Sequence, residues 1–399
     1  MHCRASHQWS GNAVAPTTGL TGGGGVNRDY PLTYCTNIHP GETWADVRRN
    51  LEDHGLQVKR LCSPAQAFPL GLRLSARAAF ELDEAEIHRF ANWCGEHDCH
   101  VLTLNGFPYG SFHGTAVKQN VYLPDWRDPL RVSYTKRLAD IAVQWTPNHR
   151  PISISTVPVA FRAGFEPAHW TIVRTHLFDV AAHLARIRER GGPLIRLAIE
   201  PEPCCVVERT DEAVALFERM AFPEPLAAHV GLCFDCCHQA VEFEEPADCL
   251  AKLASASIPI AKVQVSSALR ARGKAVAALL QFDEPTYLHQ AVVLLRNGEL
   301  RRFTDLPGLA RWLQEGEPPE ECRVHFHVPI FLEELGGIGT TRFFLEACLP
   351  RLPSGTPLEV ETYSFGALPP AMRLDSLGHS IARELNWVRE TLDAAHSRH

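Results

Sequence analysis

The stretch GLCFDCCHQA, residues 231 to 240, places an acid and an imidazole, Asp235 and His238, three positions apart at the end of an apolar run. Cys233 and Cys236 form a C-x-x-C over the same residues. Such a set could bind a metal, take part in redox chemistry or simply end a strand. No second cysteine pair with zinc-ribbon spacing exists, and most cysteines fall in apolar segments, where a free thiol packs as a small hydrophobe. We therefore expect the cysteines to pack around Asp235 and His238.

Polar residues end other apolar, β-branched runs in the same way. Glu200 lies in LAIEPEP, Gln264 in VQVSS and Glu361 in EVETYSF. Together with Asp235 they offer a hard oxygen set that leaves room for water or a substrate hydroxyl, which favours one Mg2+ or Mn2+ ion. A histidine ligand would admit Co2+ or Zn2+. The sequence predicts a metal site at Glu200, Asp235, Gln264 and Glu361.

Three histidines are candidates to join this metal site or to bind substrate. His238 lies close to Asp235, whereas His325 and His327, in VHFHVPIF, share one side of an extended segment because alternate residues of a strand do. A single histidine is more often a structural residue than a ligand. The prediction therefore depends on the whole set.

Solvated strand ends are the alternative interpretation of the carboxylates. Glu200 and Glu361 would then be caps on surface strands, since burying carboxylates without partners is costly. Glu202 and Glu359, two residues away from them, are the better candidates for that exposed role.

Ligands this far apart in sequence need a scaffold that brings strand ends together. Eight apolar runs begin near residues 34, 69, 101, 152, 195, 230, 260 and 358, and segments of helical periodicity such as DEAEIHRFANWCGEHD separate them. Most intervals are one βα unit long, which predicts an α/β fold of the (β/α)8 TIM-barrel type. Polar residues at the carboxyl ends of barrel strands converge on one axial site. A doubly wound sheet with a small second domain is the alternative, which the regular period disfavours.

The interval before the last run is too long for one βα unit. Within YLHQAVVLLRNGELRRFTDL, two strand-like runs flank Asn297-Gly298, a strong hairpin-turn signal. We expect an insertion after the seventh strand, over about residues 268 to 321, with a β-hairpin and a short helix near LPGLARWLQ. It would lie beside the mouth of the barrel, as a lid or as a subunit contact.

Composition limits the classes of function. The chain has 399 residues, 45% of them hydrophobic, and a formal net charge of -7. Residues 1 to 28, with GGGG at 22 to 25, predict a flexible tail before a barrel over residues 29 to 399. No basic stripe indicates nucleic acid, and no apolar segment indicates a signal peptide or a membrane span. We expect a cytoplasmic protein that binds a small polar metabolite, and a homo-oligomer is compatible with the sequence.

The residues of LAIEPEP, CFDCCH and EVETYSF resemble the xylose isomerase-like TIM-barrel superfamily of sugar phosphate isomerases, epimerases and endonuclease-four-like enzymes, over about residues 30 to 395. Gln264 stands in the third ligand position, as in the hydroxypyruvate isomerase branch. TYCTNIHPGETW, LNGFPYGSFHG and HFHVPIF look closest to the EboE-type metabolite traffic proteins.

This resemblance implies a metal-dependent isomerase or epimerase. Glu200 and Glu361 would each bind the metal through one oxygen and exchange a proton with the substrate through the other, by way of an enediolate. Polar residues near other strand ends are candidates for substrate contacts: Asn37, His39, Asn105 and His113. A phosphoesterase of the endonuclease-four-like type and a non-catalytic metabolite-binding or traffic protein are the alternatives.

Overall fold

The computed structural model describes residues 30 to 396 except 115, 147–149, 317–318 and 374. The tail predicted over residues 1 to 28 lies outside the described residues. In the part of the chain that is described, no helix is both long and apolar enough to cross a membrane.

Eight parallel strands form the central sheet. Their order is β1-β14-β7-β6-β5-β4-β3-β2, and a parallel bridge between Cys35 and Gly71 brings the two outer strands together, so the sheet nearly closes into a barrel. The prediction of a (β/α)8 barrel is confirmed. The strands are β1 (Leu32–Tyr34), β2 (Phe68–Arg73), β3 (Cys99–Asn105), β4 (Ile152–Thr156), β5 (Ile195–Ile199), β6 (Val230–Asp235), β7 (Ile260–Val265) and β14 (Leu358–Val360).

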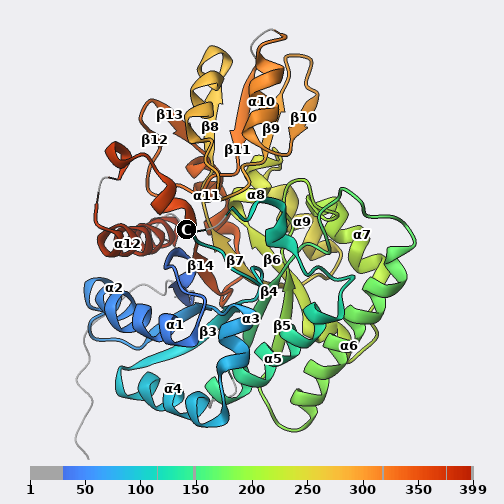
Figure 1. Ribbon diagram of the computed structural model, residues 1–399, viewed down its shortest axis with the longest axis vertical. Coiled ribbons are helices and arrows are strands. Elements are labelled where there is room, and N and C mark those ends of the chain that lie inside the picture. The colour runs from blue at the N-terminus through green and yellow to red at the C-terminus, as the bar shows by residue number, and fades with distance from the viewer. Residues whose placement is uncertain (1–29, 115, 147–149, 317–318, 374, 397–399) are drawn as a thin grey trace, which may run out of the picture.

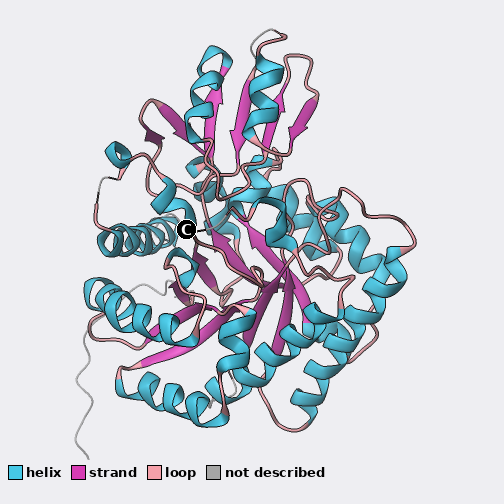
Figure 2. Cartoon of the chain, in the orientation of Figure 1, coloured by secondary structure: helices cyan, strands magenta, loops and turns pink. Residues whose placement is uncertain are grey.

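Helices surround this sheet on its outer side, as Figures 1 and 2 show. Their starts follow sequence signals: Thr43 forms a capping box with Asp46, Asp83 caps the helix that begins at Glu84, and Pro129 is the first residue of a helix of 17 residues. The helices are α1 (Trp44–Asn50), α2 (Leu56–Cys62), α3 (Ala76–Glu81), α4 (Glu84–Glu96), α5 (Pro129–Trp145), α6 (His169–Glu189), α7 (Thr210–Met220), α8 (Cys236–Val241), α9 (Pro246–Ser255), α11 (Arg342–Cys348) and α12 (Leu377–His396).

A second, antiparallel sheet follows β7 and stands above the barrel in Figure 1. Its order is β10-β9-β11-β8-β13-β12, with helix α10 (Leu306–Leu313) after β10. Its strands extend past the range of 268 to 321 that we expected for the insertion, because β11, β12 and β13 complete it. They are β8 (Leu269–Arg272), β9 (Ala291–Leu294), β10 (Leu300–Phe303), β11 (Glu321–Val324), β12 (Glu334–Leu335) and β13 (Ile338–Thr340).

β9 and β10 pair antiparallel, with Leu294 opposite Leu300. Between them, Gly298 has a φ of 86°, a conformation that glycine adopts at little steric cost. The amide of Gly298 donates to the carbonyl of Leu295, and the amide of Leu295 donates to that of Glu299. The local turn chemistry therefore satisfies the backbone at this end of the sheet.

A buried ion pair fills the barrel beneath the strand ends. The Lys262 ammonium, on β7, lies 2.5 Å from Oε2 of Glu359 on the neighbouring strand β14, and both side chains are buried. Glu359 is thus not a solvated cap, because it points inward. Burial opposes the charge of Lys262, but the Glu359 carboxylate outweighs it and raises the pKa of Lys262.

Candidate metal and substrate site

Four predicted ligands lie at the carboxyl ends of neighbouring strands. Glu200 directly follows β5, Asp235 ends β6, Gln264 is the penultimate residue of β7 and Glu361 directly follows β14. All four are at most 5% exposed. One carboxylate oxygen from each of Glu200, Asp235 and Glu361 lies within 4.8 Å of the other two, and Gln264 pairs in register with Asp235. The barrel brings these residues together because parallel strands all end on the same face.

The charges of this group oppose one another. Burial raises the pKa of Glu200 well above the usual range of a glutamate, and the carboxylates of Glu361 and Asp235 raise it further. Burial likewise raises the pKa of Glu361, with Asp235 adding to the effect. The ammonium of Lys262, two residues before Gln264 on β7, lowers the pKa of both glutamates and so offsets part of this repulsion.

Several oxygens of the group have no hydrogen-bond partner among the described residues. They are Oε2 of Glu200, Oδ2 of Asp235 and Oε1 of Gln264, and Nε2 of Gln264 is unpaired as well. A buried carboxylate without a partner is costly, whereas a divalent cation would satisfy these oxygens and favour the ionised form. The donor set therefore fits a hard divalent metal ion.

Two amides, one just after β1 and one at the end of β3, hold the carboxylate of Glu361. Its Oε1 accepts hydrogen bonds from Nδ2 of Asn37, at 2.8 Å, and from Nδ2 of Asn105, at 3.2 Å. These two amides fix one oxygen of the carboxylate and leave the other for a different partner. Asn37 and Asn105, which we expected to contact substrate, are therefore also positioning groups for Glu361.

The two other predicted substrate residues lie in different settings. His113 bridges the carbonyl of Asn37, at 2.6 Å from Nε2, and the hydroxyl of Tyr287, at 2.7 Å from Nδ1. His39 lies 3.1 Å from the Tyr34 hydroxyl and stacks on His54. Neither is among the residues that line the central cavity.

The D-x-x-H spacing has a local structural cause. Asp235 caps α8: its Oδ1 accepts from the backbone amide of His238, at 2.9 Å, and from the hydroxyl of Ser266, at 2.8 Å. Its Oδ2 stays without a hydrogen bond among the described residues and lies 3.8 Å from Nε2 of His238. One oxygen therefore builds the helix start, and the other remains available as a ligand.

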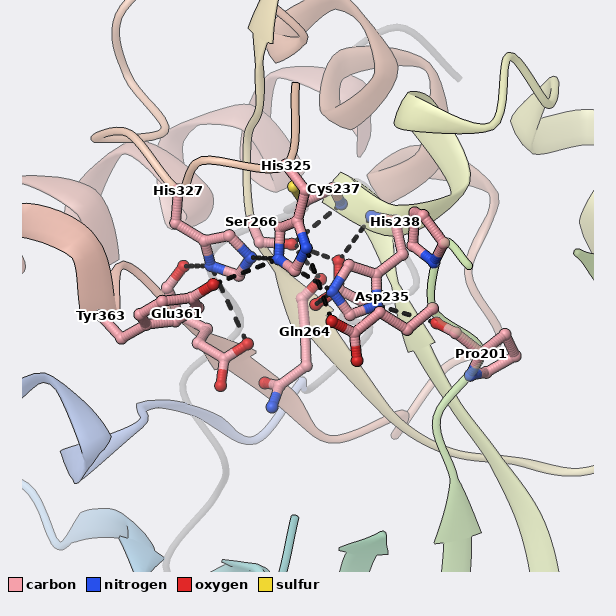
Figure 3. Close-up of polar contacts among 12 residues, drawn as sticks. Pro201, Asp235, Cys237, His238, Gln264, Ser266, His325, His327, Glu361 and Tyr363 are labelled. Carbon is pink, nitrogen blue, oxygen red and sulfur yellow. Dashed lines mark hydrogen bonds and ion pairs between the residues drawn. The ribbon is translucent and has the colours of Figure 1, made fainter. Parts of the chain in front are cut away.

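The three candidate histidines meet beside Asp235 (Figure 3). Nε2 of His325 lies 3.2 Å from Nε2 of His238 and 3.1 Å from Nε2 of His327. Burial lowers the pKa of His325 well below its usual value and that of His327 to about 4. Cys237 is also adjacent, with a ligand atom within 4.8 Å of one on each of His325 and His327.

Sequence reasoning missed a polar network around Glu202. We expected an exposed cap, but Glu202 is buried, and its Oε1 accepts from the hydroxyl of Tyr122, at 2.7 Å, and from Nε2 of Gln290, at 3.2 Å. Oε1 of Gln290 lies 2.8 Å from Nδ1 of His325. Nothing in the local pattern predicts these contacts, because Tyr122, at the end of a 3-10 helix, and Gln290, just before β9, are far from residue 202 in sequence.

A cavity opens onto the carboxylates. Its polar wall includes Glu200, Glu361 and His325, and its apolar wall includes Phe107 and Val121 from the segment after β3. Tyr287 and Leu288, which precede β9, and Tyr363, which follows β14, complete the cover. The cavity combines a few converging polar groups with apolar walls, as binding sites for small molecules do.

The comparisons with known proteins support the fold. No protein-family model matches the chain, and no curated protein matches it. A xylose isomerase-like TIM barrel protein from Mycobacterium smegmatis, solved in complex with magnesium, superposes with a TM-score of 0.53 and 12% sequence identity over 92% of this chain and 97% of that chain. The chain therefore has the fold of the xylose isomerase-like TIM barrels.

Two further solved structures resemble the chain more distantly. The probable 3-DHS dehydratase AsbF from Bacillus anthracis has a TM-score of 0.47 and 11% identity over 90% of this chain and 98% of that chain. A D-psicose 3-epimerase solved in the presence of D-fructose has a TM-score of 0.47 and 10% identity over 91% of this chain and 99% of that chain.

Proposed function

We propose that the protein is a metal-dependent isomerase or epimerase that acts on a sugar or a related hydroxy-carbonyl metabolite. The observation that carries this proposal is the pair of buried carboxylates, Glu200 and Glu361, which flank Asp235 and Gln264 along the sheet order β14-β7-β6-β5. Epimerisation at a carbon next to a carbonyl needs one group that removes the proton and a second group, on the opposite face of the substrate, that returns one.

One divalent metal ion, Mg2+ or Mn2+, would be bound by Glu200, Asp235, Gln264 and Glu361. When bound, it would stabilise the negative charge that develops on two adjacent substrate oxygens in the enediolate. The M. smegmatis protein of the same fold was solved with magnesium, which agrees with this choice.

Different residues of the chain transfer the proton, position the carboxylate and exclude water. Glu200 and Glu361 exchange the proton at opposite sides of the substrate carbon, one as base and the other as acid. Asn37 and Asn105 hold Oε1 of Glu361, which keeps its other oxygen directed at the reacting centre. The apolar residues of the cavity limit access of water to the site.

Exchange of substrate hydrogen with deuterated solvent tests the proposal. A panel of aldoses, ketoses and their phosphates is incubated with the metal-loaded protein in D2O, and deuterium uptake is followed by mass spectrometry. We expect metal-dependent uptake that falls about 10²- to 10⁴-fold in Glu200→Gln and in Glu361→Gln. The matched control is Glu384→Gln, a buried carboxylate on α12 that is not among the cavity-lining residues. Exchange that is unchanged in both site variants would contradict the assignment of roles.

A metal-dependent phosphoesterase is the second candidate, because His238, His325 and His327 gather next to Asp235. Imidazole ligands suit zinc, and zinc ions can assist attack of water on a phosphoester. Hydrolysis of bis(p-nitrophenyl) phosphate, lost on chelation, would favour this candidate if no deuterium exchange is found. Absence of both reactions, with a sugar still bound, would leave the metabolite-binding role, which the resemblance to EboE-type proteins suggested.

A further inference from the structure

The cavity that opens onto the carboxylates has a cluster of apolar and aromatic side chains in its wall. Phe112, Val117 and Tyr287 form a buried hydrophobic cluster, with Val121 and Tyr363 packed against it, and all five residues line the cavity. The ring centroids of Phe112, Tyr287 and Tyr363 lie 5.1 or 5.2 Å from one another. These five residues form the aromatic cluster of the cavity. Such a surface can pack against an aliphatic or aromatic group of a ligand.

The hydroxyl groups of the cavity tyrosines already have protein partners. Three tyrosines are among the described residues that line the cavity. Each hydroxyl has a single proton to donate. Their distances are 2.7 Å from Tyr287 to Nδ1 of His113, 2.7 Å from Tyr122 to Oε1 of Glu202 and 3.3 Å from Tyr363 to Nε2 of His325. The tyrosines therefore present their rings to a ligand.

The two histidines that line the cavity have their ring protons engaged as well. Nδ1 of His238 lies 2.8 Å from the carbonyl oxygen of Pro201, which only accepts, so Nδ1 carries the proton of the neutral ring. Nδ1 of His325 donates to Oε1 of Gln290, because the amide nitrogen of that glutamine faces two other acceptors. In the neutral rings Nε2 presents a lone pair. Neither histidine thus offers an N–H group to an anionic ligand.

The charges of the cavity wall also disfavour an anionic ligand. Lys118 is the one lysine or arginine among the described residues that line the cavity, and its ammonium lies 2.8 Å from Oδ2 of Asp305. The same lining holds three carboxylates, those of Glu200, Glu202 and Glu361. Oε2 of Glu202 is buried and has no hydrogen-bond partner among the described residues. A phosphate group would therefore meet negative charge without a free cation to pair with.

We propose that the substrate is an uncharged hydroxy-carbonyl compound with an aliphatic or aromatic substituent, and not a sugar phosphate. Its carbonyl and the adjacent hydroxyl lie at Glu200 and Glu361, and the substituent packs against the aromatic cluster. A chain of hydroxyl groups in the place of that substituent would be buried without hydrogen-bond partners, which weakens binding. The inference rests on the proposed function, because that function places the reacting carbon between the two carboxylates.

Four hydroxy ketones make a matched test of the substrate class. Phenylacetylcarbinol carries a phenyl group, acetoin a methyl group, erythrulose further hydroxyl groups and erythrulose 4-phosphate an anion. The full-length, Mg2+-loaded protein is titrated with each compound by calorimetry, and deuterium uptake from D2O is followed for each. We expect the affinity and the kcat/KM of exchange to be at least about 10-fold higher for phenylacetylcarbinol than for erythrulose, and lowest for erythrulose 4-phosphate.

A substitution in the aromatic cluster sharpens this test. Val121→Thr replaces a methyl group with a hydroxyl group of similar size, so we expect the preference for phenylacetylcarbinol over erythrulose to fall about 10-fold. Val214→Thr is the matched control, because Val214 is partly buried on α7 and is not among the residues that line the cavity. The control should leave the preference unchanged.

A second substitution tests the part that Lys118 plays. Asp305→Asn removes the charge that pairs with the Lys118 ammonium and keeps a side-chain oxygen to cap α10. We expect erythrulose 4-phosphate to bind about 10-fold more tightly to this variant, and phenylacetylcarbinol to bind as it does to the wild type. Unchanged binding of the phosphate would overturn the role given to this ion pair.

Equal affinity for the four compounds, or a preference for erythrulose or its phosphate, would overturn the inference, as would a protein that binds none of them. Binding in the expected order without deuterium uptake would support the substrate class and contradict the isomerase proposal. Uptake that is fastest with erythrulose 4-phosphate and is lost in Glu200→Gln would support the isomerase proposal and overturn the substrate class.

Discussion

The parallel barrel and the antiparallel sheet bring different donor atoms to the same place. The carboxylates of Glu200, Asp235 and Glu361 lie at the ends of the barrel strands β5, β6 and β14, whereas the imidazoles of His325 and His327 lie in the segment that directly follows β11. The barrel gathers residues that are far apart in sequence through strand register, and the sheet presents two residues by simple alternation along one segment. A hard oxygen group and a nitrogen-rich group therefore lie side by side, each built by a different kind of sheet.

Asp235 is the residue where the two regions meet, so its substitution should have the largest effect. We expect Asp235→Asn to weaken Mn2+ binding by more than about 100-fold, beyond the loss typical of an outer-shell change. Asparagine is as good a helix cap as aspartate, so α8 should persist. Titration calorimetry with Mn2+ measures the affinity, and circular dichroism checks the fold. An unchanged affinity would show that Asp235 is not a metal ligand.

The barrel region should be sensitive at the amides that hold Glu361. We expect Asn105→Ala and Asn37→Ala each to lower solvent exchange about 10- to 100-fold, because the Glu361 carboxylate loses a positioning hydrogen bond. Deuterium uptake at saturating Mn2+ measures this effect, and circular dichroism checks the fold. Solvent exchange that is unchanged in both variants would mean that the two amides do not position Glu361.

Glu384 of α12 joins the two regions and should give a pH-dependent effect. Its Oε1 accepts from the Thr362 hydroxyl, at 2.6 Å, and from the amide of Ile330, at 3.1 Å, and burial raises its pKa to about 7. The folded state thus favours the protonated form, so this contribution to stability is complete below about pH 4.5 and is lost as the pH rises to about 7.

The variant Glu384→Gln avoids that loss. We expect its free energy of unfolding, relative to the wild type, to increase between pH 4.5 and pH 7 by up to about 3 kcal/mol. Urea unfolding at both pH values measures this change, with the exposed Glu390→Gln on the same helix as the control. If the stability of the variant relative to the wild type fell between pH 4.5 and pH 7, folding would have to lower the pKa of Glu384, which would contradict this prediction.

The smallest effect is expected at a glycine that belongs to the barrel alone. A Cβ on Gly71 would lie 2.0 Å from Oε1 of Glu359 and 2.7 Å from the carbonyl oxygen of Tyr34. We expect Gly71→Ala to destabilise the protein by about 1–3 kcal/mol through this overpacking. Gly95→Ala, on α4 with no heavy atom within 4 Å of the added Cβ, is the matched control and should not destabilise it. Urea unfolding of the two variants and the wild type measures this difference, and equal stability of the two variants would contradict the expected overpacking.

Several features of the site depended on contacts that no local pattern contains. We expected Glu202 and Glu359 to be exposed strand ends. Both are buried, and Tyr122 hydrogen-bonds to Glu202 whereas Lys262 pairs with Glu359. Lys262 and Gln264 share one face of β7 because alternate residues of a strand do, but no local pattern pairs Lys262 with Glu359 of β14.

The sequence by itself determined the barrel and the position of Glu200, Asp235, Gln264 and Glu361 at strand ends. Periodic apolar runs specify parallel strands, and all such strands end on one face. Only the tertiary structure decided that His325 and His327 of the antiparallel sheet meet His238, and which way each ring carries its proton. The physical reason is that these arrangements depend on single hydrogen bonds between segments distant in sequence, which neither periodicity nor residue spacing encodes.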